Sequence, residues 1–117
     1  MDNLRFKFRA WIEEDNEYMF AGSSTGRSVS MSWFWETVYK YGYEVEQYTG
    51  LKNLYENDII QDNIGIGAVE YKSEYAGFRV NYKNGRCKWF YDYLESEMKT
   101  IEIIGNIHEN PELLEKA

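Results

Sequence analysis

The sequence holds little of the chemistry on which small catalytic or metal-binding domains usually depend. Its 117 residues include one cysteine, one proline and one histidine. The single cysteine, Cys87, excludes an internal disulfide and is typical of proteins from a reducing compartment. Because Cys87 and His108 each stand alone, they do not match the ligand spacing of a zinc site. We therefore expect no cofactor, no metal and no catalytic residue, and a protein that is not an enzyme.

Long hydrophobic runs and clusters of positive charge are also missing. No apolar stretch approaches the roughly 18 residues that cross a bilayer, and the N-terminal sequence lacks the apolar region of a signal peptide. The formal net charge is -7, whereas nucleic-acid binding requires a concentrated basic surface. These absences predict a soluble protein of the cytoplasm that does not contact membranes, and they argue against a nucleic-acid partner.

Aromatic side chains are abundant, with eleven tyrosines, six phenylalanines and four tryptophans. Apolar and polar residues alternate along 5–12 and again along 78–82 and 87–91, which is typical of half-buried strands. Asn84-Gly85 lies between the strands expected over 78–82 and 87–91 and predicts a hairpin with a type I′ turn. We predict an all-β, mainly antiparallel fold over a single domain, residues 1–117, built as a small β-barrel or strongly bent sheet with one or two short helices.

Two short helices are expected within this fold. The first region, 29–43, fits both a strand and a helix, and we favour a helix over 33–40 that Ser32 caps and Gly42 ends. The second begins at Asn110 as the cap, with the single proline at the first helical position.

The aromatic residues of the first helix are the candidate interaction site. Burial in a core, an oligomer interface and a platform for ligand stacking are all consistent with their types. An acidic protein without a catalytic set suits binding to another protein or to itself, so we predict a homo-oligomer. The candidate protein-interface residues are Met31, Trp33, Phe34, Trp35, Tyr39 and Tyr41.

Two alternative sites follow from other residues. A nucleic-acid surface would use basic residues interleaved with aromatic side chains that stack on single-stranded bases; these basic residues are Arg79, Lys83, Arg86 and Lys88. A hydrolase would use the carboxylates of Glu56, Asp58 and Asp62, although acids at the start of a strand are commonly solvated. We further expect Arg9 and Trp11 on the solvent face of the first strand and Cys87 in a core or interface position.

The segment 45–60 is predicted to join two halves of the molecule. It contains a strand end, a turn at Gly50, a short polar loop and the start of another strand at Asp58. Gly50 and Leu51 are interpreted as scaffold, whereas Asn53 lies in the part that is free to vary.

Three pieces of the sequence together resemble the YopX family of small phage and prophage proteins. They are Lys7-Phe8-Arg9-Ala10-Trp11, Gln47–Lys52 with Tyr55–Ile60, and Ile104–Leu114. Ile12 stands where the family has an acidic residue, the loop before Tyr55 is shorter, and Asn57 replaces a glycine. The resemblance implies a mainly β fold with minor helices and a role as a phage or prophage accessory protein in a bacterial host. It implies no established activity, and a host or phage protein is a further candidate partner.

Overall fold

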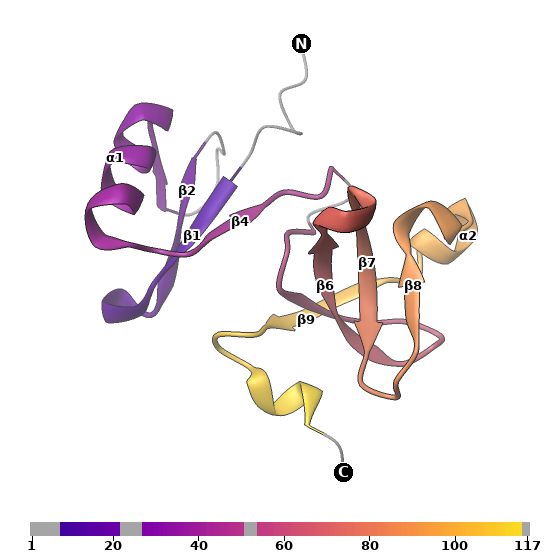
Figure 1. Ribbon diagram of the computed structural model, residues 1–117. Coiled ribbons are helices and arrows are strands. Elements are labelled where there is room, and N and C mark those ends of the chain that lie inside the picture. The colour runs from indigo at the N-terminus through magenta and orange to yellow at the C-terminus, as the bar shows by residue number, and fades with distance from the viewer. Residues whose placement is uncertain (1–7, 22–26, 51–53, 116–117) are drawn as a thin grey trace. The chain divides into compact units, whose positions relative to one another are not determined.

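The chain divides into two compact units, Met1–Tyr55 and Glu56–Ala117. The computed structural model describes residues 8–21, 27–50 and 54–115 (Figure 1). The boundary between the units lies inside the segment 45–60, which confirms that this segment joins two halves. The prediction of a single domain over residues 1–117 stays a prediction.

The first unit contains a four-stranded sheet in the order β3-β2-β1-β4. Its strands are β1 (Phe8–Ile12), β2 (Glu17–Ala21), β3 (Arg27–Val29) and β4 (Val45–Gln47). β1 pairs antiparallel with both β2 and β4, while β2 pairs parallel with β3. The turn between β1 and β2 is a short 3-10 helix, Glu13–Asp15, and Asn16 closes it in the left-handed conformation, with φ 53°.

Helix α1 (Met31–Tyr41) follows β3 and contributes to the core of this unit. The side chain of Ser30 accepts a hydrogen bond from the backbone N–H of Trp33 at 3.3 Å, so the cap is Ser30 and not Ser32. Gly42 ends the helix with φ 70°, as predicted, because a residue without a Cβ adopts this conformation at little cost. The fully or nearly buried core residues are Ala10, Ile12, Met19, Ala21 and Phe34.

The expectation that Arg9 and Trp11 face solvent is wrong. Both side chains are buried. Arg9 Nε donates to Glu46 Oε1 of β4 at 2.7 Å, and the guanidinium carbon lies 3.8 Å from the centre of the Tyr18 ring. Alternation predicts a solvent face only where nothing covers that face, and here aromatic rings and a carboxylate cover it.

The second unit contains a five-stranded antiparallel sheet in the order β8-β7-β6-β5-β9. The short helix α2 (Glu95–Met98) follows β8, and a 3-10 helix, Pro111–Leu114, follows β9. Figure 1 shows β6, β7 and β8 side by side. The strands are β5 (Asp58–Gln61), β6 (Ile66–Lys72), β7 (Gly77–Tyr82), β8 (Cys87–Trp89) and β9 (Glu102–Asn106).

The hairpin at Asn84-Gly85 is confirmed, but its predicted turn type is wrong. Of these two residues only Gly85 has a positive φ, at 94°. The Tyr82 N–H donates to Arg86 O at 2.8 Å and the Gly85 N–H donates to Tyr82 O at 3.0 Å. These bonds enclose a three-residue loop that ends on a left-handed glycine, the second common hairpin type.

The structure corrects three further expectations. Within the described residues the strands form two open sheets, and no closed barrel is found. Cys87 is exposed, so it does not fill a core position. Asn110 makes no side-chain cap for the last helix; its Oδ1 instead accepts from the Asn106 N–H at 3.3 Å. The mainly β, mainly antiparallel fold with short helices is confirmed.

Candidate functional site

Helix α1 places most of the predicted interface residues on the surface of the first unit. Tyr39 is 92% exposed, and Met31, Trp33, Trp35 and Tyr41 are between 40% and 59% exposed. The assignment of Phe34 to this interface is wrong, because Phe34 is 0% exposed and packs in the core. When a globular domain exposes this many large apolar side chains on one short helix, they often mark an interaction site.

The exposed aromatic residues do not form one surface, because they lie on two flanks of α1. The side chains of Trp33, Thr37 and Lys40 repeat at helical spacing and line one hollow of the surface. Ser32, Trp35 and Tyr39 repeat one residue out of phase and line a different hollow. We call the first the acidic flank and the second the apolar flank.

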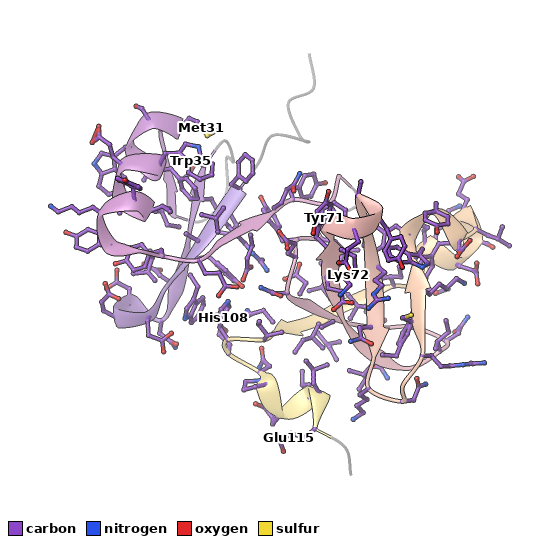
Figure 2. All side chains as sticks on the ribbon, viewed as in Figure 1. Met31, Trp35, Tyr71, Lys72, His108 and Glu115 are labelled. Atoms are coloured by element: carbon purple, nitrogen blue, oxygen red, sulfur yellow. The ribbon has the colours of Figure 1, made fainter. Side chains whose placement is uncertain are left out.

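The apolar flank is a shallow hollow of about 560 Å³ lined by Ser32, Trp35, Glu36, Val38 and Tyr39. Trp35 is held in place by edge-to-face contacts, each with 5.2 Å between ring centroids, to Phe8 and Phe34. Figure 2 labels Met31 and Trp35 on α1. A fixed tryptophan beside an almost fully exposed tyrosine is the kind of pair that is enriched at protein interfaces.

The acidic flank is a groove of about 600 Å³ between α1 and the turn that follows β1. The buried side chains of Ile12 and Met19 also line it. Rings from the helix and from the residues after it form one part of the lining, and the 3-10 turn contributes carboxylates. The aromatic and acidic lining residues are Trp33, Tyr41, Tyr43, Glu14, Asp15 and Glu36.

A hydrogen bond ties the turn to the segment after α1. The Tyr43 hydroxyl donates to Glu14 Oε2. This bond to a carboxylate raises the pKa of Tyr43 to about 12, because ionising the phenol would remove the donor and place two negative charges together. Tyr43 therefore stays neutral at ordinary pH and holds the Glu14 carboxylate at the edge of the groove.

The four residues of the alternative nucleic-acid surface are not gathered on one face. Arg79 is directly opposite Trp89, whereas Lys88 is opposite Val80, so Arg79 and Lys88 point to opposite faces of the sheet. Two of the cations are also paired with acids: Arg79 Nε donates to Glu70 Oε2 at 2.5 Å and Lys88 Nζ to Glu97 Oε2 at 2.8 Å. The Lys83 ammonium reaches the backbone oxygen of Glu115, and Arg86 is exposed.

One exposed aromatic cluster was not predicted as a unit. The rings of Tyr75 and Trp89 meet edge to face at 5.2 Å, and Trp89 stacks with Tyr91 at 6.0 Å. The Arg79 guanidinium lies over Trp89 on the same face. Tyr75 comes from the turn after β6, and no local pattern of the sequence connects that turn with β8.

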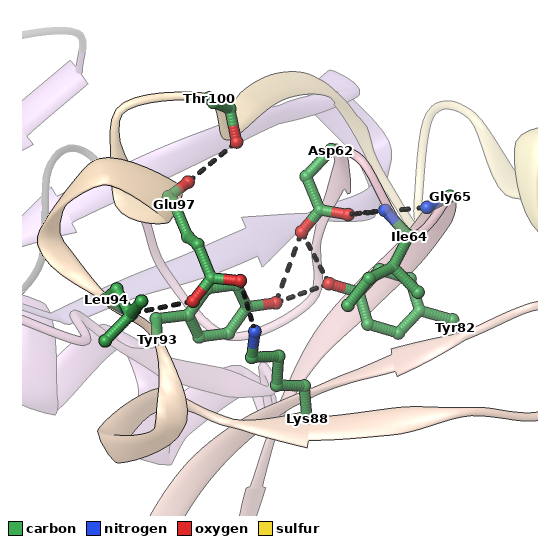
Figure 3. Close-up of polar contacts among 9 residues, drawn as sticks. All are labelled: Asp62, Ile64, Gly65, Tyr82, Lys88, Tyr93, Leu94, Glu97 and Thr100. Carbon is green, nitrogen blue, oxygen red and sulfur yellow. Dashed lines mark hydrogen bonds and ion pairs between the residues drawn. The ribbon is translucent and has the colours of Figure 1, made fainter.

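The three acids of the hydrolase hypothesis all lie within the described residues, and Glu56 is half-buried. Asp58 is buried. Asp62 Oδ1 accepts from the Ile64 N–H at 2.9 Å, and Asp62 Oδ2 accepts from the Tyr82 hydroxyl at 2.5 Å (Figure 3). Tyr93 adds a second hydroxyl to this cluster, hydrogen-bonded to that of Tyr82. Burial, followed by the bond to Asp62, raises the pKa of Tyr82 well above its ordinary value.

The described ranges contain neither a metal-binding cluster nor a membrane-spanning helix. No group of three or more His, Cys, Asp or Glu side chains in residues 8–21, 27–50 and 54–115 is arranged to hold a metal ion. None of the helices in these ranges combines the length and the hydropathy that crossing a membrane requires.

Comparison with known proteins places the chain in a family. No curated protein shows significant similarity to it. The model of the family described as YopX protein matches residues 7–115, which is nearly the whole chain. The match runs from the β1 residues through the segment 45–60 to the 3-10 helix after β9, and thus contains both units. The chain belongs to the YopX family.

Proposed function

We propose that the protein is a non-enzymatic interaction protein that associates with a second copy of itself through the apolar flank of α1. The proposal is carried by two side chains that line the same hollow. Trp35 is held in place by Phe8 and Phe34, and Tyr39 is 92% exposed. Burying an aromatic ring of this size removes about 150–250 Å² from water.

A two-fold symmetric contact suits a single exposed helix. In such a contact the same patch meets itself, so each Tyr39 ring can enter the apolar hollow beside the other copy's Trp35. The patch of one helix is smaller than the roughly 800 Å² per partner of a standard interface. We therefore expect association in the micromolar range and not an obligate dimer.

The setting of this activity is carried over from the family resemblance. We propose a phage or prophage accessory protein that acts in the cytoplasm of a bacterial host, with a host or phage protein as a further partner of the same flank. The nucleic-acid alternative is not favoured, because Arg79 and Lys88 face opposite sides of the sheet and each is paired with an acid.

Size-exclusion chromatography with light scattering, run from low to high micromolar concentration, tests the self-association. The natural chain should move from monomer to dimer, and Tyr39→Ala should stay monomeric over the same range. Tyr91→Ala is the matched control, because Tyr91 is a similarly exposed tyrosine outside α1. A natural chain that is strictly monomeric at high micromolar concentration overturns the proposal, as does a Tyr39→Ala variant that dimerises normally.

A further inference from the structure

The acidic flank of α1 differs from the apolar flank in its chemistry and therefore in what it can bind. Its groove of about 600 Å³ lies within the range of small-ligand pockets. Ile12 and Met19 line it but are only 3% and 0% exposed, so its accessible apolar surface comes from the rings, such as that of Trp33, which is 47% exposed and suits the methylene stem of a long side chain.

The charges around the groove are mainly negative. Glu14 and Asp15 come from the turn after β1, Glu36 comes from α1, and Lys40 is the basic residue among those that line it. The groove thus carries three carboxylates and one ammonium. A charge balance of this kind attracts a cation and repels an anionic ligand.

Aromatic rings add a second preference for a cation. Trp33, Tyr41 and Tyr43 line the groove, and the rings of Tyr41 and Tyr43 lie 5.6 Å apart. The chain already uses one of these rings in this way, since the Lys40 ammonium lies 5.3 Å from the centre of the Tyr41 ring. An arginine guanidinium is planar, stacks on aromatic faces and pairs with carboxylates at the same time.

We propose that the groove between α1 and the turn after β1 binds an arginine side chain of a basic peptide segment in a partner protein. The methylene stem lies along the ring of Trp33, and the guanidinium lies between the aromatic rings and the carboxylates of Glu14 and Glu36. Because Glu14 accepts a hydrogen bond from Tyr43 through one oxygen, its second oxygen remains the natural acceptor for the guanidinium. This site goes beyond self-association, which uses the apolar flank; Glu36 lines both hollows, whereas Glu14 lines only the groove.

The test is an NMR titration of the isotope-labelled full chain with a short peptide, acetyl-Gly-Arg-Arg-Gly-amide. The neutral probe acetyl-Gly-Gln-Gln-Gly-amide has the same length and is run in parallel. The arginine peptide should shift the Trp33 indole N–H and the Thr37 amide, and the shifts should weaken at higher salt. The glutamine peptide should leave both signals in place up to concentrations on the order of 10 mM.

Two substitutions locate the site and one controls for bulk charge. Glu14→Gln and Glu36→Gln should each weaken binding of the arginine peptide about fivefold, as expected for one ion pair near the surface. Glu44→Gln removes the same charge from an exposed residue of the same unit that does not line the groove, so it should change the affinity by less than about twofold.

The possible outcomes separate this inference from the proposed dimer. Equal binding of the two peptides, equal effects of the three substitutions, or no shift at Trp33 and Thr37 would each overturn the arginine site. The titration is repeated on Tyr39→Ala, which removes the proposed dimer contact and should leave the peptide affinity unchanged. Peptide binding by a chain that never dimerises supports the groove and refutes only the dimer.

Discussion

Arg9 of β1 and Glu46 of β4 form a buried ion pair, with Arg9 Nε 2.7 Å from Glu46 Oε1 and both side chains at most 7% exposed. The Arg9 guanidinium also lies over the rings of Tyr18 and Tyr55, at 3.8 Å and 4.6 Å from their centres. Because Arg9 and Glu46 are directly opposite each other, the pair favours this register of β4 against β1, and it is almost entirely shielded from water.

Removing one partner of this pair is expected to destabilise the protein strongly. Glu46→Gln removes this carboxylate from the buried Arg9 guanidinium, and breaking a buried ion pair costs about 3–5 kcal/mol. Urea denaturation measures the loss as a lower midpoint. The control is Glu70→Gln, because the Arg79–Glu70 pair is 21% and 30% exposed and should contribute about 0–1 kcal/mol.

The double substitution Arg9→Met with Glu46→Leu sharpens this test. It removes both charges and keeps apolar volume, so it should be more stable than either single variant and close to the natural chain. A double variant that is as unstable as Glu46→Gln would show that packing, and not the broken ion pair, causes the loss.

The burial of Arg9 also shows that an alternating pattern does not predict which face of a strand meets solvent. The strand expected over 5–12 follows from local alternation, and the structure confirms it over β1, Phe8–Ile12. Which side of β1 meets solvent depends on Glu46 and Tyr55, which are distant in sequence. A pattern with period two identifies two faces, but it does not say that one of them is uncovered.

Gly50 gives a test of the scaffold role of segment 45–60. Its φ is 84°, and a Cβ at this position would meet nothing within 4 Å. The constraint is therefore the backbone conformation and not the space. Gly50→Val should lower stability by roughly 1–2 kcal/mol or more, because a β-branched residue resists positive φ.

Gly50→Asn separates the two explanations. Asparagine visits the left-handed region readily, and Asn16 and Asn57 of this chain already have φ of 53° and 69°. The asparagine variant should thus keep most of the stability that the valine variant loses. Equal melting temperatures for the natural chain and Gly50→Val would contradict the scaffold interpretation. The proposed role of Leu51 and Asn53 lies outside the described residues.

The candidate site shows a similar division between what sequence predicts and what it does not. The aromatic residues of α1 follow from composition and from the apolar spacing of Met31, Phe34 and Val38. Their separation into two flanks depends on the phase of the helix relative to the sheet. That phase is fixed by the burial of Phe34, since both neighbours, Trp33 and Trp35, then lie on opposite sides of the contact. Helical spacing in the sequence places Phe34 and Trp35, but not Trp33, on one stripe with Met31 and Val38, and it does not say which of these two rings enters the core.

The Asp62 cluster is expected to stabilise the second unit. Tyr82→Phe removes the hydroxyl that donates to Asp62 Oδ2 at 2.5 Å. A hydrogen bond to a charged group contributes about 1.5–3 kcal/mol, so the free energy of unfolding should fall by about this amount. Urea denaturation measures the loss as a lower midpoint. Tyr91→Phe is the control, because Tyr91 is exposed and its change should stay within about 0.5 kcal/mol. Equal midpoints for the two variants would refute a stabilising role for the cluster.

The hydrogen bond from Tyr43 to Glu14 predicts an unusual titration at the edge of the acidic groove. The pKa of Tyr43 is raised to about 12, whereas an ordinary tyrosine ionises near pH 10. Because the folded-state pKa lies above the unfolded value, the stabilisation from this bond is fully present below about pH 10 and is lost as the pH rises through about 12. Glu14→Gln removes the carboxylate that causes the shift, so the pKa of Tyr43 should fall towards its ordinary value.

The measurement is an NMR titration of chains carrying ring-labelled tyrosine, with Tyr43→Phe used to assign the signal. The reference is the ordinary tyrosine pKa near 10. If Tyr43 titrates near pH 10 in the natural chain, or if Glu14→Gln leaves its midpoint in place, the bond to Glu14 does not persist in solution. The arginine groove would then lose the contact that orients Glu14. In that case Glu36→Gln should lower the affinity for the arginine peptide more than Glu14→Gln does.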